Sequence, residues 1–483
     1  MAGTGFKLWP RGEECGICGI FGHKEAANYV YLGLYALQHR GQESSGMAVY
    51  GGDPPRLRGH RAMELVADCF DEARIRSLSG SHAIGHVRYS TNGSNLLANA
   101  QPLICHTAQG SIAAAHNGNL VNSRALRRDL EGNGSIFQGT SDTEVILHLI
   151  ARSRADGLRQ AIIEALTKVQ GAYSLLFLSR DRMIAVRDPH GFRPLCLGKF
   201  EGSLVLASET CALDLIGAQY VRDIEPGELV EITEMGLQSY RPWPTQPHHH
   251  CIFEHIYFSR PDSFVFGEEV HTVRKRIGAN LAAEDNVEAD IVVPVPDSSI
   301  CAGLGYAQAS GLPYEIGMIR NHYVGRTFIE PNQHIRDFGA KIKYNPVRGA
   351  IAGKRLIVVD DSIVRGTTAR KIIDMLRRGG AKEVHLRSSC PPIIAPCYYG
   401  VDTPSKAELI AANYSVEEIC KRIGADSVAY PSLKGLLSCV ERPEEYCIAC
   451  FTGTYPTCVP SPEDEELREQ ERLQPSLFSH YEA

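Results

Sequence analysis

The 483-residue sequence lacks any run of about 18 uninterrupted apolar residues, the length that a helix needs to cross a membrane. Residues 1–14 also lack the apolar stretch, roughly 7–15 residues long, that marks a secretory signal. These absences argue against membrane proteins and exported proteins. We therefore expect a cytoplasmic protein with no membrane partner.

An excess of basic charge is missing as well. The chain has 50 Lys and Arg against 56 Asp and Glu, which leaves a net charge of −6. That balance gives no overall attraction for a polyanion, so we expect no nucleic-acid partner. Any phosphate group must then be bound by donors placed locally.

Internal repeats and low-complexity blocks are also absent. The hydrophobic fraction of 43% and the charged fraction of 22% are typical of a globular protein with a large core. Because domains usually span roughly 100–200 residues, we expect two. The 15 cysteines should be free thiols in a reducing compartment, and their spacing indicates which ones carry chemistry.

The first half of the chain reads as a mixed α and β domain over residues 15–240. Short apolar runs between Gly-rich turns predict strands at Ser174–Leu178, Met183–Val186 and Ser203–Ala207. Apolar residues at helical spacing predict helices over Tyr29–Leu37 and Thr143–Ala151. The Pro- and His-containing segment Pro242–His250 is the expected boundary.

The second half, residues 241–460, changes to alternating strands and helices. The pattern predicts strand, helix, strand and helix at Asp290–Val295, Ala302–Ala309, Arg355–Val359 and Thr367–Arg378. Such alternation is typical of a parallel sheet. Residues 461–483 are polar and acidic and are expected to form a peripheral tail.

The run from Arg355 to Thr368 carries the most specific signal. A buried strand delivers Asp360 and Asp361 at its carboxyl end, where ligands bind in open α/β sheets, and a loop then opens a helix. The N–H groups at that helix start suit a phosphate, and the carboxylates suit ribose hydroxyls or Mg²⁺. The Asp-Asp pair taken alone could simply end a strand.

The whole phrase Val359-Asp-Asp-Ser-Ile-Val-Arg-Gly-Thr-Thr368 resembles the phosphoribosyl pyrophosphate loop of the type I phosphoribosyltransferases, most closely that of the glutamine amidophosphoribosyltransferases. The resemblance implies that Asp360 and Asp361 contact the ribose and Mg²⁺. It also implies that the 5′-phosphate is bound by the loop residues Ser362, Ile363, Val364, Arg365, Gly366, Thr367 and Thr368.

Two further phrases, Pro294–Ser299 and Arg320–Pro331, match the same family. By resemblance Ser298 completes the Mg²⁺ site, and residues 323–343 form a flap over the sugar whose Arg326 and Lys341 contact the substrate. A flap makes chemical sense because water would compete with ammonia for the sugar carbon. Each of these basic residues taken alone could be solvated surface.

Near the start, Cys15 and Cys18 form a Cys-x-x-Cys pair, which could be a redox or metal pair or simply buried side chains. The surrounding motifs resemble the glutaminase domains of the N-terminal-nucleophile class. They are Cys15-Gly-Ile, Gln38-His-Arg-Gly-Gln42, Gly85-His-Val-Arg-Tyr-Ser-Thr91, His116-Asn-Gly-Asn119 and Gly139-Thr-Ser-Asp-Thr-Glu144. Their common order covers the first half of the chain.

That resemblance implies a nucleophilic Cys15 whose own α-amino group, with a pKa of about 8, accepts the thiol proton. Residues 1–14 would then be a removable propeptide. The family pattern gives the oxyanion donors as the Asn117 side chain and the Gly118 N–H. Glutamine would be bound by Arg88, Asp142 and Thr91, with Arg40 supporting the closing glutamine loop.

The pair Cys447-Ile-Ala-Cys450 offers two soft ligands for an iron–sulfur cluster or for zinc. By resemblance to the cluster-containing subgroup, Cys251 and Cys397 complete one [4Fe–4S] site. Zinc held with the neighbouring His248–His250, competition from Cys390, Cys439 or Cys458, and four unligated buried cysteines remain alternatives. A cluster here would tie the domain boundary to the C-terminal region.

The resemblances together imply an α+β N-terminal-nucleophile (αββα) glutaminase domain followed by an α/β type I phosphoribosyltransferase domain. The expected enzyme moves ammonia from glutamine to phosphoribosyl pyrophosphate in purine synthesis, with feedback by purine nucleotides and a homotetrameric assembly. A non-catalytic sensor of phosphoribosyl pyrophosphate is the alternative, although such a protein could discard Cys15. The Asp360 loop argues against a sugar-isomerase partner domain and hence against a hexosamine synthase.

Overall fold

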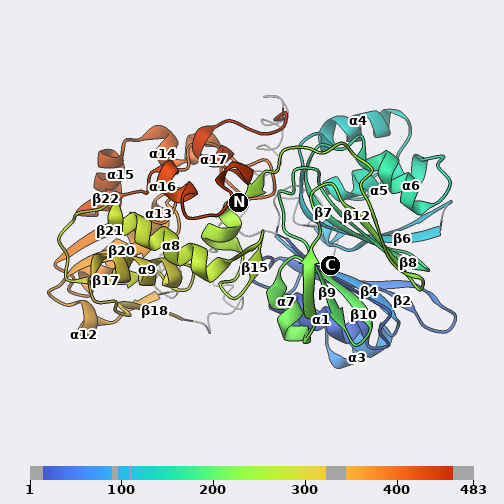
Figure 1. The fold of residues 1–483 in the computed structure, drawn as a ribbon, viewed down its shortest axis with the longest axis horizontal. Helices are drawn as coiled ribbons and strands as arrows, with labels where there is room; N and C mark the ends of the chain where they lie inside the picture. The colour runs from blue at the N-terminus through green and yellow to red at the C-terminus, as the bar shows by residue number, and fades with distance from the viewer. Residues whose placement is uncertain (1–14, 90–95, 109, 322–343, 461–483) are drawn as a thin grey trace, which may run out of the picture.

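The computed structural model describes residues 15–89, 96–108, 110–321 and 344–460. The elements fall into two groups that form two lobes in Figure 1, which we call the first and second domains. The expected propeptide and tail, Thr91, and the expected flap with Arg326 and Lys341 lie outside the described residues.

Two antiparallel sheets build the first domain. One has, in spatial order, β11 (Gln219–Asp223), β9 (Cys196–Phe200), β10 (Ser203–Ala207), β1 (Gly16–Phe21), β4 (His82–Arg88), β2 (Ser44–Gly51) and β3 (Arg56–Ala62). The other has β13 (Gly236–Tyr240), β12 (Leu229–Thr233), β8 (Arg182–Arg187), β7 (Gly171–Leu178), β6 (Gly110–Leu120) and β5 (Leu103–Thr107). Side chains from both sheets meet in a shared core, which includes Ile17, Ile84, Leu176 and Val230.

Helices cover the outer faces of both sheets, which makes four layers (Figure 1). Beside the first sheet lie α1 (Ala26–Ala36), α2 (Val66–Cys69), α3 (Glu72–Ser77) and α7 (Thr210–Ile216). Beside the second lie α4 (Ser123–Gly132), α5 (Asp142–Arg152) and α6 (Leu158–Leu166). The expected strands and helices of this half are confirmed, with ends shifted by a few residues.

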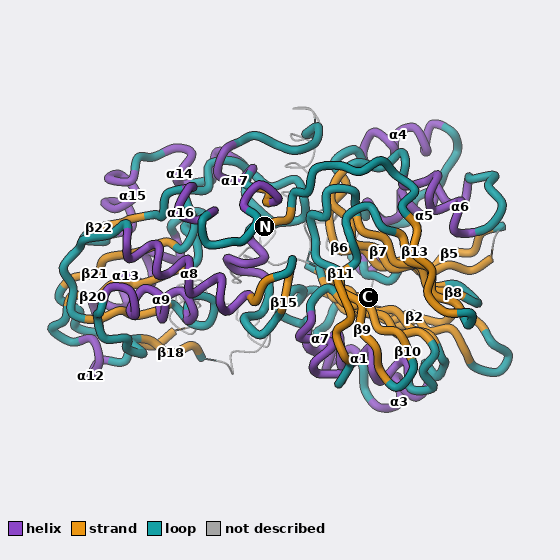
Figure 2. Tube along the Cα trace, in the orientation of Figure 1, coloured by secondary structure: helices purple, strands orange, loops and turns teal. Residues whose placement is uncertain are grey.

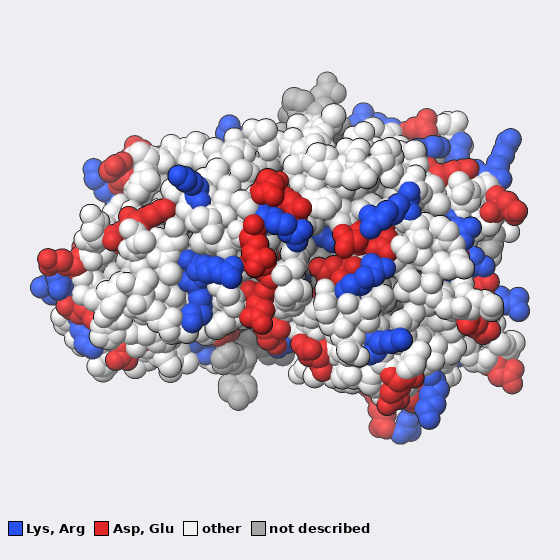
Figure 3. All heavy atoms as spheres, viewed as in Figure 1, with Lys and Arg blue, Asp and Glu red and all other residues white. Residues whose placement is uncertain are grey.

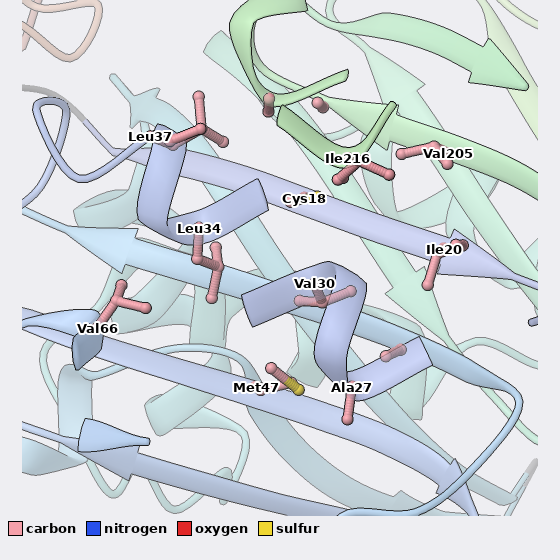
Figure 4. Close-up of a cluster of buried hydrophobic side chains, with 14 of the residues drawn as sticks. Cys18, Ile20, Ala27, Val30, Leu34, Leu37, Met47, Val66, Val205 and Ile216 are labelled. Carbon is pink, nitrogen blue, oxygen red and sulfur yellow. The ribbon is translucent and has the colours of Figure 1, made fainter. Parts of the chain in front are cut away.

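Helix α1 forms because small and apolar residues recur on one of its faces. Ala27, Val30 and Leu34 are buried against the first sheet, where Cys18 on β1 and Met47 on β2 lie beneath them (Figure 4). Cys18 is completely buried. This packing fixes the strand that begins directly after Cys15.

The second domain contains a four-stranded sheet whose neighbouring strands are all parallel, as expected. Its order is β17 (Ile291–Pro294), β20 (Arg355–Asp360), β21 (Glu383–Ser388) and β22 (Ser427–Ala429). The longer helices are α8 (Val270–Ala283), α9 (Ile300–Ser310), α13 (Thr367–Arg378) and α15 (Val416–Ile423). Figure 2 shows them as the purple segments around this sheet.

Helix α13 has the predicted bounds. Its buried residues Ala369, Ile372, Ile373 and Leu376 follow the spacing of a helix with one apolar face. The short elements of this domain are α12 (Arg348–Ile351), α14 (Ile410–Asn413), α16 (Leu433–Leu437), α17 (Ala449–Thr452), the pair β15 (Phe264–Val265) and β16 (Glu268–Glu269), and the pair β18 (Met318–Arg320) and β19 (Tyr344–Pro346).

The expected linker crosses between the domains without helix or strand over residues 241–249. It ends in β14 (His250–Cys251), which pairs in parallel with β23 (Tyr446–Cys447) and places Cys251 opposite Cys447. A π-helical turn, Glu254–Phe258, follows. In the described ranges no helix has the length and apolar character required to span a membrane.

Candidate functional site

Cys15 lies directly before β1 and is buried, with its Sγ 3.7 Å from the carbonyl oxygen of Tyr89. Two residues further along β1, the Ile17 N–H donates to Ser208 Oγ at 3.0 Å. The same Oγ accepts a bond from Asn117 Nδ2 of β6 at 3.4 Å. Ser208 therefore links the strand that follows the candidate nucleophile to the candidate oxyanion donor, across the two sheets.

Gly118 follows Asn117 on β6 in a conformation that requires glycine. Its φ is +150°, and a Cβ at this position would lie 2.1 Å from the carbonyl oxygen of Ala172 on β7. A side chain would force β6 and β7 apart. The backbone at the expected oxyanion position is thus fixed by its neighbours before any substrate binds.

The expected glutamine-binding residues Arg88 and Asp142 are both buried, at the end of β4 and the start of α5. Asp142 Oδ2 accepts a hydrogen bond from the Leu120 N–H at 2.9 Å, and its Oδ1 lies 3.6 Å from His116 Nδ1. Burial opposes ionisation, but His116 and the surrounding donors hold the pKa of Asp142 below its usual value. An ionised carboxylate here suits a substrate ammonium group.

Cys15 and Cys18 do not behave as a redox pair. Cys18 is three residues along the chain on an extended strand, and its Sγ packs against Gly33 of α1. Complete burial raises the pKa of Cys18 to about 12, so it remains a thiol and serves as core.

Arg40, which is expected to support the closing glutamine loop, takes part in a buried ion-pair network. Its guanidinium is fully buried between Glu209, at 2.6 Å, and Glu254 of the second domain, at 2.7 Å. Its Nε also donates to the Cys15 carbonyl oxygen at 3.0 Å. Burial opposes ionisation of Glu209, but His39 and Arg40 hold its pKa far below the usual range. Arg40 thus fixes the Cys15 backbone and joins the two domains.

The predicted phosphate loop follows β20 in the second domain. Gly366 has a φ of +74° directly before α13, and Thr367 and Thr368 are exposed in its first turn. Ile363 is buried and anchors the loop in the core. The Arg365 side chain turns away to Glu408, at 2.6 Å. The loop can therefore offer backbone N–H groups and hydroxyls to a phosphate.

The expected metal residues do converge. Asp361 accepts hydrogen bonds from Ser298 at 2.6 Å and from Ser362 at 2.7 Å, and the Asp361 N–H donates to Asp360 Oδ1 at 3.0 Å. Burial raises the pKa of Asp361, which the two hydroxyls and Arg274 partly offset. Closely placed carboxylate and hydroxyl oxygens suit a divalent cation with hard oxygen ligands, and such a cation would favour the ionised form of Asp361.

No broad basic area is seen among the described residues on the face drawn in Figure 3. On the face drawn in Figure 3, basic and acidic side chains are interspersed. On this face, no broad basic area competes with the local donors of the loop.

The four cysteines expected to ligate a cluster line one cavity. Cys251, Cys397, Cys447 and Cys450 surround it together with Phe192 of the first domain and Phe253, Tyr399, Val401, Thr403 and Ala449 of the second. Burial, with a smaller contribution from Cys397, raises the pKa of Cys447 to about 12. The neighbouring thiols oppose one another's ionisation, a cost that a bound cationic centre would remove. Their number, their softness and their shared cavity fit an iron–sulfur cluster.

The neighbouring histidines do not face that cavity's ligands. His248 Nδ1 and His250 Nε2 lie 3.4 and 3.9 Å from the carboxylate oxygens of Glu445. These three residues are close enough to share an ion, but Arg442 already supplies a cation to Glu445 at 3.0 Å. This arrangement weakens the zinc alternative for the cysteine set.

Sequence reasoning missed Arg193 and Glu254. Arg193 is fully buried, donates through Nε and Nη2 to the Tyr399 carbonyl oxygen at 2.9 and 2.7 Å, and contacts Glu254 at 3.3 Å. One sequence signal could have indicated this contact: Glu254 is a lone carboxylate in the apolar phrase Cys251-Ile-Phe-Glu254. Because a buried charge needs a partner, a buried basic residue could have been expected beside it.

Comparisons with known proteins show which proteins this chain is similar to. A model of the glutamine amidotransferase domain matches residues 86–215. Amidophosphoribosyltransferase 1, chloroplastic, of Arabidopsis thaliana is 54% identical over 92% of this chain and 79% of the relative. The amidophosphoribosyltransferase of Bacillus subtilis is 49% identical over 92% of this chain and 94% of the relative.

Solved structures give the same result for the fold. A structure described as the allosteric regulatory enzyme of purine biosynthesis superposes with a TM-score of 0.89 at 48% identity, covering 93% of this chain and 97% of that one. The B. subtilis glutamine phosphoribosylpyrophosphate amidotransferase complexed with ADP and GMP has a TM-score of 0.88 at 48% identity, covering 93% and 98%.

Proposed function

This chain belongs to the amidophosphoribosyltransferase family of purine biosynthesis, and we propose that its two half-reactions take place at Cys15 and at the Asp360 loop. Its fold combines a glutaminase domain of the N-terminal-nucleophile class with a type I phosphoribosyltransferase domain. As a glutamine-dependent enzyme, it produces 5-phosphoribosylamine, glutamate and pyrophosphate from glutamine, phosphoribosyl pyrophosphate and water.

The observation that carries the proposal is the convergence of two separate sets of groups. Cys15 and Asn117 are joined through Ser208 in the first domain. Ser298 and Ser362 bond to Asp361 in the second. Each set matches one half-reaction.

In the glutaminase half, the Cys15 Sγ attacks the glutamine amide carbon while the freed α-amino group takes the thiol proton. Asn117 Nδ2 and the Gly118 N–H stabilise the oxyanion, and a missing donor of this kind costs about 3–4 kcal/mol. Ammonia leaves, and water then releases glutamate from the thioester. Arg88 and Asp142 hold the substrate carboxylate and ammonium, with Thr91 assisting.

In the transfer half, the backbone and hydroxyls of residues 362–368 hold the 5′-phosphate, and Asp360 with Asp361 orient the ribose. Ser298, Asp360 and Asp361 would hold Mg²⁺, which when bound neutralises charge on the pyrophosphate leaving group. Ammonia displaces pyrophosphate at the sugar C1. Arg326 and Lys341 complete this site in the proposal.

The maturation step supplies the base. We propose the domain bounds 15–240 and 241–460, with residues 1–14 removed to free the Cys15 amino group. N-terminal sequencing of active enzyme should then begin at Cys15. Full activity from a chain that still starts at Met1 would require another base.

The same proposal assigns one [4Fe–4S] cluster to Cys251, Cys397, Cys447 and Cys450, because these four cysteines line one cavity. Such a centre would tie β14 to β23 and to the segment around Cys397.

Anaerobically purified protein should contain iron and sulfide and absorb broadly at about 400 nm. Replacing Cys447 and Cys450 together by Ser should remove both, whereas Cys439→Ser, at a buried position outside that cavity, should not. Stoichiometric zinc without sulfide would contradict the assignment.

Regulation, assembly and location are further parts of the proposal. A related structure carries ADP and GMP, so we propose feedback by purine nucleotides on a homotetramer. No disulfide joins two cysteines in the described part of the chain, which fits a reducing cytoplasm. Pyrophosphate release that requires glutamine separates this enzyme from the sensor alternative. A folded protein that binds phosphoribosyl pyrophosphate without releasing pyrophosphate would favour the sensor.

A further inference from the structure

Asn119 ends the His116-Asn-Gly-Asn119 motif, yet neither half-reaction uses it. It lies on β6 directly after Gly118 and is 3% exposed. Its Nδ2 donates to the Tyr398 carbonyl oxygen of the second domain at 2.7 Å. The candidate oxyanion strand is thus bonded to the other domain one residue beyond its glycine.

A second contact between the same segments involves no side chain. A Cβ at Gly400 would lie 3.3 Å from the Cα and carbonyl carbon of Gly118, and Gly400 has a φ of +110°. Between these contacts, the Tyr399 carbonyl oxygen accepts two bonds from Arg193. Residues 398–400 therefore lie against the end of β6.

The remainder of that segment leads to the other site. Its first residues follow β21, where the Ser389 N–H donates to the Asp360 carbonyl oxygen at 2.8 Å. Cys397 of the cysteine-lined cavity precedes Tyr398 directly. Twelve residues, 389–400, thus connect the phosphoribosyl carboxylates to the oxyanion strand.

Stability alone does not account for an asparagine at position 119. Its Oδ1 is buried and has no hydrogen-bond partner among the described residues. A buried acceptor without a donor typically costs about 1–3 kcal/mol. The Nδ2 contact with Tyr398 is the feature that distinguishes asparagine from an apolar side chain of similar size.

We propose that Asn119 is a positioning residue for the glutaminase reaction, clamping the Asn117–Gly118 oxyanion donors to the Tyr398 carbonyl of the second domain. The inference rests on the proposed roles of Cys15, Asn117 and Gly118. Oxyanion donors act only at the correct distance, and displacements near 1 Å can cost about a hundredfold in rate. Docking of residues 398–400 then sets the rate of glutamine hydrolysis.

The test compares Asn119→Ala with Asn122→Ala. Asn122 makes the same kind of bond, Nδ2 to the Lys168 carbonyl oxygen at 2.9 Å, but within the first domain. For Asn119→Ala we expect the glutaminase kcat to fall about 10- to 100-fold, while the KM for glutamine and ammonia-dependent synthesis stay within about twofold. Asn122→Ala should leave all three within about twofold.

A variant in the second domain, at the same contact, tests whether a loss of activity in Asn119→Ala reflects only a folding defect. Gly400→Ala places a methyl group against Gly118, whereas Gly424→Ala, at a φ of +78°, meets open space. Gly400→Ala should reproduce the selective loss of glutaminase kcat, and Gly424→Ala should not. An unchanged glutaminase kcat in Asn119→Ala, or equal loss of both activities in both interface variants, would overturn the inference. A wild-type enzyme without glutaminase activity would instead refute the proposed function.

Discussion

The two candidate sites differ in how they are assembled. The glutamine site draws buried groups from β1, β4, β6 and α5, so packing of two sheets fixes its geometry. The phosphate loop is one continuous segment whose Thr367 and Thr368 are exposed. The difference suits the chemistry: a thioester reaction needs preorganised donors, whereas a sugar phosphate can be held by one loop at a helix start.

The largest effect is expected from a variant of the phosphate loop in the second domain, which should lose one of the two activities and keep the other. Asp360→Asn combined with Asp361→Asn removes the carboxylates that we propose to orient the ribose and Mg²⁺. Synthesis from either glutamine or ammonia should fall at least about a thousandfold, because positioning and electrostatic stabilisation both fail. Glutamine hydrolysis by the same protein, measured as glutamate release, should continue.

The matched control for that variant is Asp374→Asn, which removes a carboxylate from the middle of α13 in the same domain. It should leave both activities near wild type. Retained synthesis in the Asp360 and Asp361 double variant would show that the loop is not the transfer site.

A smaller effect, on the free energy of unfolding, tests the buried ion pair between Arg40 of the first domain and Glu254 of the second. Glu254 accepts bonds from Arg40 at 2.7 and 2.9 Å and from Ser259 at 2.6 Å, all of them buried. Glu254→Gln leaves buried guanidinium charge uncompensated, and the free energy of unfolding should fall by about 3–5 kcal/mol. Glu72→Gln, which breaks the exposed pair with Arg76, should change it by less than about 1 kcal/mol. Denaturant titration of both variants measures these changes. Equally small losses of unfolding free energy in Glu254→Gln and Glu72→Gln would contradict a stabilising buried ion pair.

The smallest effect concerns acid stability. Burial lowers the pKa of His86 in the first domain and of His255 in the second to about 3 in each case. Between about pH 6.5 and 3 the unfolded chain binds protons that the folded state does not, so stability falls as the pH falls.

Replacing either histidine by Gln should flatten that decline by up to about 1.4 kcal/mol per pH unit. Unfolding titrations at several pH values between 6.5 and 4.5 measure the slope. An unaltered slope in His86→Gln would mean that this histidine is protonated in the folded protein.

Much of each domain could be predicted from local sequence. The alternating sequence pattern, closed by Gly379-Gly380, predicted the bounds of α13, and the Gly366 turn and the Asp360 strand end are local features. The interdomain contacts could not be predicted, because Arg40 and Glu254 are separated by 214 positions and nothing local to either indicates the partner. The β14–β23 pairing, only two residues long, is likewise too short for any periodic pattern.

The most direct test of the account is the nitrogen source used by Cys15→Ala. The variant should lose glutamine-dependent synthesis to below about one-thousandth of wild type, because the nucleophile is gone. With a high concentration of free ammonia it should form 5-phosphoribosylamine and pyrophosphate at about the wild-type rate, since the transfer site is intact. Equal loss of glutamine-dependent and ammonia-dependent synthesis in a correctly folded variant would contradict the assignment of two separate sites.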